Sequence, residues 1–407
     1  MRVAAGSVAY SGLECRGQLF AKRRSVSLGI DRLVEDGFAA LEGKRVGLVT
    51  NQSGVDGKGK KTRLVMHASK KVKLVALYAP EHGLDGVALA GKKVASGRDG
   101  ATGLAVHSLY GATRKPTAEM LRGVEVLVFD MQDVGARCYT YVSTMGLCME
   151  AAAAAGIPFV VLDRPNPLGG ERVEGPPLES QWKSFVGMYP VPFVHGLTAG
   201  ELARMANGEG WLKSKVDLTV VPLGDWTRTT RWDQTRLKWV RTSPNIPNGQ
   251  SPFYYIASGI TGHLAGADVG TGTGLPFEYA TAKGVDPDAF VRRMRSFDLR
   301  GVEFSPYFSK KKSGFGGVRM KLDPGEVGNL AALDVLLMAE LHRALKSAGG
   351  SIFAGSTKSE LDVFYKVYGS DRIRREIEGG RPVGEIVSSW DAGVSKFRAR
   401  REKYLLY

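Results

Sequence analysis

The chain of 407 residues exceeds one ordinary domain, so we expect two. Its 43% hydrophobic and 24% charged residues are normal for a globular protein, and its net charge of +15 favours an anionic partner such as an acidic polymer. The lysines lie in short groups at 58–61, 70–73, 92–93 and 310–312. Aromatic residues do not alternate with these groups, so the sequence predicts no nucleic-acid partner.

Cysteine and histidine usage predicts neither a disulfide framework nor a metal site. Cys15, Cys138 and Cys148 form no CxxC pattern, which indicates free thiols or a reducing compartment. The six histidines are scattered without an HExxH pattern, so no zinc is expected.

Residues 1–28 are interpreted as a disordered leader. Their basic segment at 21–24 has no apolar segment beside it, so a standard signal peptide is not expected. No apolar run reaches the length of a membrane span. We therefore expect a cytoplasmic protein, or a periplasmic or secreted one if the start site is placed too early.

From residue 29 to 245, strand and helix patterns alternate. Strands are predicted at 44–50, 72–78, 105–110, 124–130, 157–163 and 216–223, and helices at 31–41, 62–69, 117–121, 142–155 and 198–207. Repeated strand–loop–helix units of this length predict an α/β domain with a parallel sheet between helices.

A smaller α+β domain is predicted from 246 to 407. Strand patterns lie at 301–308 and 317–322, and helix patterns at 287–295, 330–345, 370–378 and 384–404. The Pro- and Asn-containing segment 242–248 precedes this domain and is interpreted as a linker or clamp.

Polar segments follow four of the predicted strands, with the sequences NQSG, APEHG, DMQDVGAR and DRPNP. Ligands of parallel sheets bind outside the carboxyl ends of the strands, so these segments predict one cleft. Its candidate residues are Asn51, Glu81, His82, Asp130, Asp133, Arg137, Asp163, Arg164 and Asn166.

A nucleotide site is an alternative at the loop 54–62, which is one residue away from the pattern GxxxxGK[ST]. The residue after the relevant lysine is Lys61 rather than Ser or Thr, so the pattern lacks its magnesium-binding hydroxyl. The glycine-rich segment 270–274 lacks a clear preceding strand and is interpreted as a turn.

Glu81 and Asp133 are the candidate acid–base pair, because glycoside hydrolysis typically uses one acid and a second carboxylate. Both residues also fit ordinary structural roles in loops, and Asp130 fits a structural role better. Arg137 and Arg164 could clamp a substrate carboxylate or neutralise these acids. Residue pattern alone predicts an enzyme with a polar cleft for a small molecule and no metal.

Six segments together resemble one known family, the exo-β-N-acetylmuramidase (NamZ) family. They read GKRVGLVTNQSGVD, APEHGLDG, DMQDVGARCYTYVSTM, LDRPNPLGG, SFVGMYPVPFVHGLTAGELA and the terminal YLLY, and the resemblance runs from about residue 29 to 407. It implies a Rossmann-like first domain (29–245), a smaller second domain (246–407) and an active site in the cleft between them.

The resemblance implies a cofactor-free exo-glycosidase that releases N-acetylmuramic acid from the non-reducing end of peptidoglycan fragments. Glu81 becomes the expected general acid and Asp133 the assisting acid. The implied substrate-binding residues are Asn51, His82, Arg137, Tyr139, Tyr141, Asp163, Arg164, Asn166, Asn245 and Glu278. The segment 264–274 departs from the family pattern, since it lacks two glutamates and an arginine. A sugar-binding homologue with no activity or altered specificity is therefore the alternative.

Overall fold

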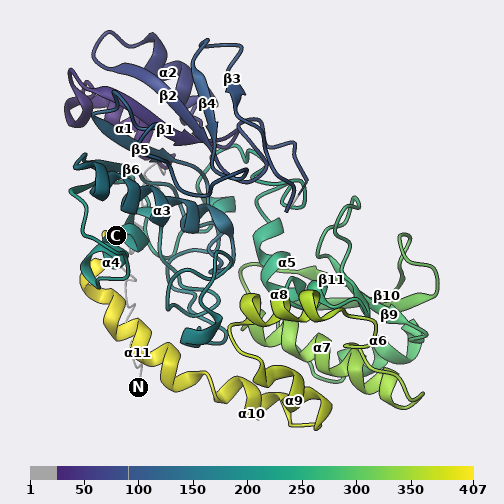
Figure 1. Cartoon of the computed structure of the whole chain (residues 1–407). Helices are drawn as coiled ribbons and strands as arrows, with labels where there is room; N and C mark the ends of the chain where they lie inside the picture. The colour runs from purple at the N-terminus through teal and green to yellow at the C-terminus, as the bar shows by residue number, and fades with distance from the viewer. Residues whose placement is uncertain (1–24, 90) are drawn as a thin grey trace, which may run out of the picture.

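The computed structural model describes residues 25–89 and 91–407, which fold into two α/β domains (Figure 1). Most of the predicted leader lies outside the described residues. Its last residues belong to the folded chain, because Val26 and Leu28 are buried and Ser27 pairs with Gly224 through the backbone. The first domain therefore begins before the predicted boundary at residue 29.

The first domain is built on a sheet of seven strands within the described ranges. They are β1 (Arg45–Thr50), β2 (Lys73–Ala79), β3 (Gly97–Arg98), β4 (Ala105–Ser108), β5 (Val126–Asp130), β6 (Phe159–Leu162) and β7 (Leu218–Val221). Their order is β3-β4-β2-β1-β5-β6-β7, and only the edge strand β3 runs antiparallel. The six parallel strands thus follow the doubly wound order 3-2-1-4-5-6, which confirms the Rossmann-like prediction.

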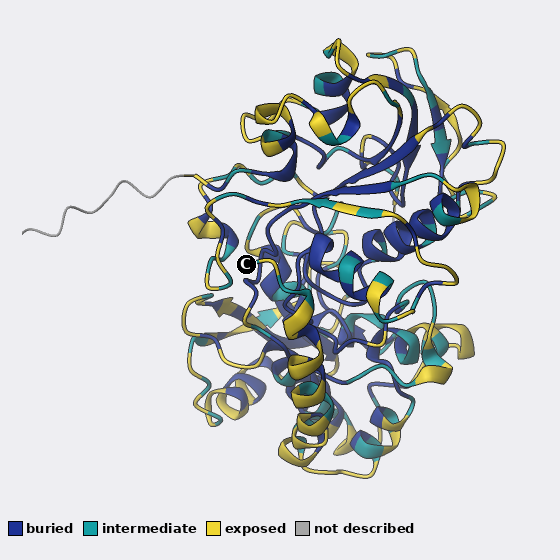
Figure 2. Cartoon of the chain, turned by 90° about the vertical axis from the view of Figure 1, so that its left-hand side faces the viewer, coloured by how far each residue is buried: buried dark blue, intermediate teal, exposed yellow. Residues whose placement is uncertain are grey.

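The central strands β1, β5 and β6 are buried on both faces, as the dark strands of the first domain in Figure 2 show, whereas the edge strands β3 and β7 are more exposed. Every residue of β5 is buried. Its sequence is accordingly a run of apolar residues that ends in Asp130, rather than an alternation of apolar and polar residues. The helices of the domain are α1 (Gly29–Glu35), α2 (Thr62–Ala68), α3 (Thr140–Ala155) and α4 (Ala199–Gly208). The predicted capping box of α4 is present, with Thr198 and Glu201 bonded reciprocally.

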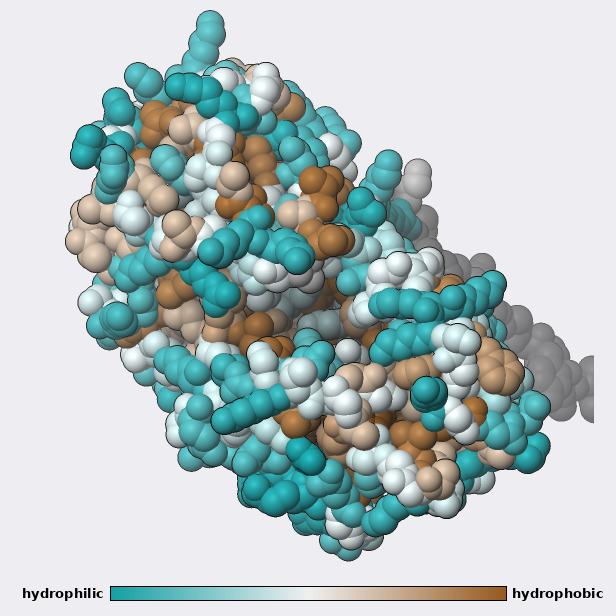
Figure 3. All heavy atoms as spheres, turned by 45° about the vertical axis from the view of Figure 1, so that its right-hand side comes forward, coloured by the Kyte–Doolittle hydropathy of each residue, from teal (hydrophilic) through white to brown (hydrophobic). Residues whose placement is uncertain are grey.

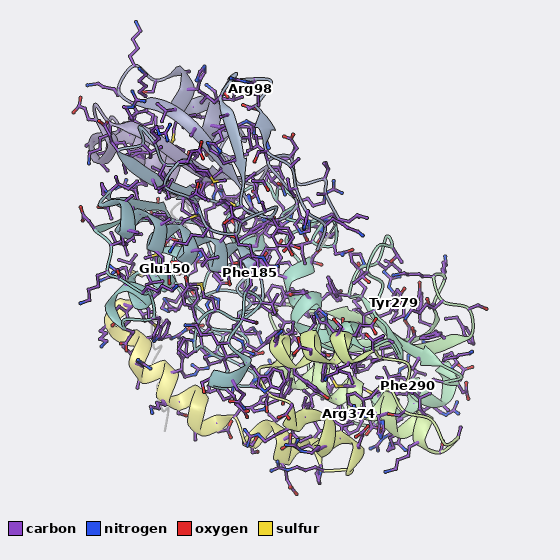
Figure 4. All side chains as sticks on the ribbon, in the orientation of Figure 1. Arg98, Glu150, Phe185, Tyr279, Phe290 and Arg374 are labelled. Atoms are coloured by element: carbon purple, nitrogen blue, oxygen red, sulfur yellow. The ribbon has the colours of Figure 1, made fainter. Side chains whose placement is uncertain are left out.

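The second domain contains an antiparallel sheet packed on helices. The sheet order is β10 (Val302–Phe308), β11 (Phe315–Leu322), β9 (Tyr279–Lys283) and β8 (Ala267–Asp268). Its helices are α5 (Ser251–Ser258), α6 (Pro287–Arg295), α7 (Leu330–Lys346), α8 (Lys358–Tyr368), α9 (Arg372–Glu378) and α10 (Val383–Ser388). Figure 4 labels Phe290, through which α6 is buried against this sheet.

The chain then returns to the first domain along α11 (Asp391–Arg401), which runs from α10 back to α4 (Figure 1). The Tyr407 hydroxyl donates to Asp163 Oδ2 over 2.7 Å and accepts from the Leu223 amide over 2.8 Å. The Tyr407 ring also packs edge-on against Trp226 at 5.0 Å. The C-terminal segment thus completes the core of the first domain.

No helix in the described part of the chain has the length and apolarity of a membrane span.

Candidate active site

A cavity of about 380 Å³ lies where the two domains meet. Figure 3 shows this face of the molecule hollowed between them. Both domains contribute its lining, which is Glu81, His82, Cys138, Tyr139, Thr140, Val186, Ser243, Asn245, Ile246, Tyr255, Gly259, Gly262, His263, Thr271, Phe277 and Val367. Of the predicted site residues, the cavity therefore brings together Glu81, His82, Tyr139 and Asn245.

Glu81 is the one carboxylate among these lining residues. It follows β2 and is buried, with both oxygens held by the protein. Its Oε2 accepts a hydrogen bond from Thr140 Oγ1 over 2.7 Å, and its Oε1 accepts one from the Gly91 amide over 2.7 Å. Burial and the nearby Glu81 carboxylate raise the pKa of the Tyr110 hydroxyl. Glu81 is thus fixed at the N-terminus of α3 with its orientation set by two donors.

Two lining residues adopt left-handed backbone conformations that side chains disfavour. His82 has φ of 70° and Phe277 has φ of 67°. His82 is pinned there because its Nδ1 lies 2.7 Å from the carbonyl oxygen of Ala88. Phe277 is pinned by its amide, which donates to the Val269 carbonyl over 2.6 Å. Each domain thus contributes one residue with a strained backbone to this cavity. Strain of this kind is concentrated at functional sites, which supports a functional role for the cavity.

An aromatic cluster forms one wall of the cavity. The ring of Tyr255 lies 6.2 Å from Tyr139 and 5.1 Å from Phe277, edge-on in both cases. The Tyr139 hydroxyl donates to Thr242 Oγ1 over 2.8 Å, and the Tyr255 hydroxyl lies 3.0 Å from Cys138 Sγ. A wall of aromatic rings with hydroxyls at its edge suits the apolar faces and polar rim of a sugar.

Neutral polar groups from the end of the first domain and from the second domain line the same cavity. Asn245 accepts from the Gly272 amide through Oδ1 over 2.8 Å, which fixes the side chain beside the loop 270–274. Burial lowers the pKa of His263 to about 4, so its imidazole is neutral at physiological pH. These residues offer hydrogen bonds to hydroxyl or amide groups without adding charge.

Asp133 lies behind the lining rather than in it. Its Oδ2 accepts from the Gly135 amide over 2.7 Å, whereas its Oδ1 is buried and has no hydrogen-bond partner among the described residues. Burial raises the pKa of Asp133 to about 7. Burial is the main cause of the raised pKa of Tyr139 and of Tyr255, and a negative charge on Asp133 adds to it.

Asp133→Asn tests this burial through the pH dependence of stability. A carboxyl whose pKa is raised in the folded state loses folding free energy as pH rises from about 4 to 7. Asn does not titrate, so the variant should gain stability relative to wild type by on the order of 2 kcal/mol between pH 5 and pH 8. Urea unfolding at both pH values measures this difference. A difference that does not change with pH would contradict the buried carboxyl.

The structure places Arg137 outside the cavity. Its Nη1 donates to the carbonyls of Pro176 and Val191, both over 2.8 Å. Its Nη2 donates to those of Val367 and Tyr368, over 3.0 and 2.7 Å. Four bonds to backbone oxygens engage both terminal nitrogens of the guanidinium and tie the two domains together, and Arg137 is not among the residues that line the cavity.

Arg164 is also engaged within the protein. It forms a two-point ion pair with the buried Asp130, with distances of 2.6 and 3.0 Å, and Asp130 accepts from Thr62 over 2.5 Å. Lys61 donates to the Gln52 carbonyl over 2.6 Å. In the loop with the nucleotide-like pattern, Lys61 and Thr62 are therefore bonded to groups of the protein itself. Asp130 has the structural role that the sequence favoured.

Five other predicted site residues do not line the cavity. Asn51 Oδ1 accepts from the amide and hydroxyl of Ser53, two positions further along the chain, and Tyr141 donates to the Thr242 carbonyl over 2.5 Å. Asp163 and Asn166 are buried and bond to protein groups around α4 and the 166–168 turn. Glu278 pairs with Arg319 over 2.8 Å beside a separate hollow of the second domain.

Sequence reasoning did not single out Cys138, Thr140, Tyr255, His263 or Phe277. Thr140 directly follows the predicted tyrosine Tyr139, and its position at the start of α3 was the available signal. Cys138 directly precedes Tyr139 in the same segment. Tyr255, His263 and Phe277 belong to the second domain and lie in no motif, because they reach the cavity only through the docking of the two domains.

The described residues hold no group of three or more His, Cys, Asp or Glu side chains arranged to bind a metal. A fold with a doubly wound sheet, a smaller sheet domain and a carboxylate in the interdomain cavity is typical of a two-domain α/β enzyme.

Comparison with known proteins identifies the family. Residues 46–250 match the model of the N-terminal domain of exo-β-N-acetylmuramidase NamZ, and residues 253–407 match that of its C-terminal domain. The chain therefore belongs to this family of glycosidases. It is 40% identical over 395 residues to the peptidoglycan β-N-acetylmuramidase NamZ of Bacillus subtilis (strain 168), which covers 95% of this chain and 92% of that protein.

Two solved structures share the fold. Both are DUF1343 family proteins of Bacteroides fragilis NCTC 9343. One, BF0371, is 39% identical with a TM-score of 0.87, and the other, BF0379, is 29% identical with a TM-score of 0.70. Each comparison covers 94% of this chain and 99% of the other chain. The two-domain architecture predicted from sequence is thus shared along nearly its whole length.

Proposed function

We propose that this protein is an exo-acting β-N-acetylmuramidase that releases N-acetylmuramic acid from the non-reducing end of peptidoglycan fragments. The observation that carries the proposal is the position of Glu81, the only carboxylate among the residues that line the interdomain cavity. Membership of the NamZ family and the name of the Bacillus subtilis relative support the substrate class.

In the proposed mechanism Glu81 protonates the glycosidic oxygen as the bond from that oxygen to the anomeric carbon breaks. The electron pair of the broken bond stays on the leaving oxygen. Water adds to the anomeric carbon and releases a proton, which restores the acid form of Glu81 for the next turnover. Asp133 lies outside the lining, and in its ionised form it is the proposed electrostatic partner of the cationic transition state. His82, Asn245 and Tyr139 are the proposed sugar-binding residues of this cavity.

The purified protein tests this function directly. Incubation with a chromogenic N-acetylmuramide should release the chromophore, and incubation with peptidoglycan oligosaccharides should release free N-acetylmuramic acid, detected by mass spectrometry. Internal cleavage of the oligosaccharides would contradict exo action. Calorimetric binding of a muramic-acid disaccharide without turnover would instead identify the sugar-binding homologue, which the altered segment 264–274 favours.

Thr140→Val should lower kcat about tenfold and leave KM nearly unchanged. Valine keeps the shape of threonine but removes the hydroxyl that donates to Glu81 Oε2 over 2.7 Å, so the carboxyl loses one of its two orienting bonds. Steady-state kinetics with the chromogenic muramide measure the effect. Thr140→Ser keeps the hydroxyl and should retain most of the activity. An equal loss in both variants would assign Thr140 to packing instead.

A further inference from the structure

The proposed substrate of the cavity is an anion, yet the lining of the cavity contains no Lys or Arg side chain to pair with it. The anionic group of N-acetylmuramic acid is its lactyl carboxylate. The two arginines expected to bind this group, Arg137 and Arg164, are occupied by backbone carbonyls and by Asp130. A cation that pairs with the carboxylate would therefore come from the rim of the cavity rather than from its lining.

Lys311 lies at this rim, on the hairpin between β10 and β11. Its Nζ donates to the carbonyl oxygen of Thr271 over 2.7 Å, and Thr271 is one of the lining residues. Lys311 is exposed, and it is not among the lysines that pair with an acidic side chain in the described part of the chain. Its positive charge is thus anchored to the cavity wall and remains uncompensated.

The hairpin that carries Lys311 is fixed to the second domain. Ser309 Oγ donates to Asp268 Oδ2 over 2.5 Å and accepts from the Lys311 amide over 3.0 Å. Asp268 also accepts from the hydroxyl of Tyr279, which Figure 4 labels on the sheet. Lys312 Nζ donates to the carbonyl oxygens of Ala265 and Ala267, at the start of β8. A cation held in place in this way binds an anion at a smaller cost in side-chain entropy.

We propose that Lys311 is the specificity-determining residue that recognises the carboxylate of the acidic sugar in the Glu81 cavity. This inference rests on the proposed function. The ammonium keeps its bond to the Thr271 carbonyl with one hydrogen and directs another to the carboxylate, since Lys has three donors. Neutral donors such as Asn245 then hold the remainder of the sugar.

The test compares one substrate with and without its charge. Lys311→Gln should raise KM for a chromogenic N-acetylmuramide about tenfold, with kcat changed less than about twofold. For the same compound with its lactyl group converted to the uncharged amide, KM should not change. Lys311→Arg keeps the charge and should retain most of the affinity for the acid. Lys310→Gln removes a neighbouring exposed lysine and should have no effect.

A merely structural role for Lys311 would raise KM for the acid and the amide equally, and this result would overturn the inference. So would an unchanged KM for both. If wild type hydrolyses neither compound, the proposed function fails, and calorimetry with N-acetylmuramic acid then tests Lys311 alone. Binding by wild type that weakens tenfold in Lys311→Gln supports the inference, whereas equal or absent binding contradicts it.

Discussion

Replacement of Glu81 by Gln should reduce kcat on a chromogenic N-acetylmuramide by about 10³-fold, the largest effect expected of any single change. The amide cannot transfer a proton to the leaving oxygen. It keeps an oxygen that can accept from the Gly91 amide or from the Thr140 hydroxyl, so the loop and helix that hold the side chain should stay in place. Substrate affinity, measured by calorimetry, should change little.

A matched control is available in the second domain. Glu278→Gln also removes one negative charge, but Glu278 pairs with Arg319 away from the cavity, so its activity should equal that of wild type. Circular dichroism and thermal unfolding of both variants exclude misfolding as the cause of a loss. Full activity of the Glu81→Gln variant would refute the assignment of the general acid.

The largest expected effect on stability is that of Arg137→Lys, at about 3 kcal/mol. Lysine keeps the charge, but it has no planar fork and cannot reach all four carbonyls that Arg137 satisfies in the two domains. Buried carbonyls without a donor cost free energy, and a buried ammonium with fewer partners costs more. The midpoint of urea unfolding, followed by tryptophan fluorescence, measures the loss.

Kinetics at low temperature separate this structural role from substrate binding. KM of the folded Arg137→Lys variant should match that of wild type, because the guanidinium does not line the cavity. A raised KM together with unchanged stability would instead restore Arg137 as a substrate clamp. Arg319→Lys, at a half-exposed ion pair, should shift stability by no more than about 0.5 kcal/mol.

Much of the first domain could be predicted because buried parallel strands produce unmistakable apolar runs. The run at β5 gives both its position and its burial, and the capping box at Thr198 gives the start of α4. The second domain was predicted less completely. Helix α5 has only eight residues, two of them tyrosines, and α8 and β9 were also missed. The predicted helix 117–121 is a series of turns, and the pattern at 384–404 divides into α10 and α11.

The candidate site shows where prediction from a single sequence ends. Glu81 could be placed from its position after a strand, since the topology of parallel sheets brings such residues to one edge. The partners of Arg137 could not be predicted, because Val367 and Tyr368 are separated from it by 230 and 231 positions in the chain. Whether an arginine faces a substrate or a set of backbone carbonyls depends on how the two domains dock. The docking of domains cannot be predicted from a local sequence pattern.

The return of the chain to the first domain has a consequence for the order of folding. Asp163 and Tyr407 are 244 positions apart, yet their contact helps to close the first domain. During synthesis the parallel sheet can form early, but it stays incomplete at Leu223 and Trp226 until residue 407 has left the ribosome. We therefore expect truncation of 404–407 to yield a collapsed first domain that exposes apolar surface, measured as dye binding, rather than an isolated native one.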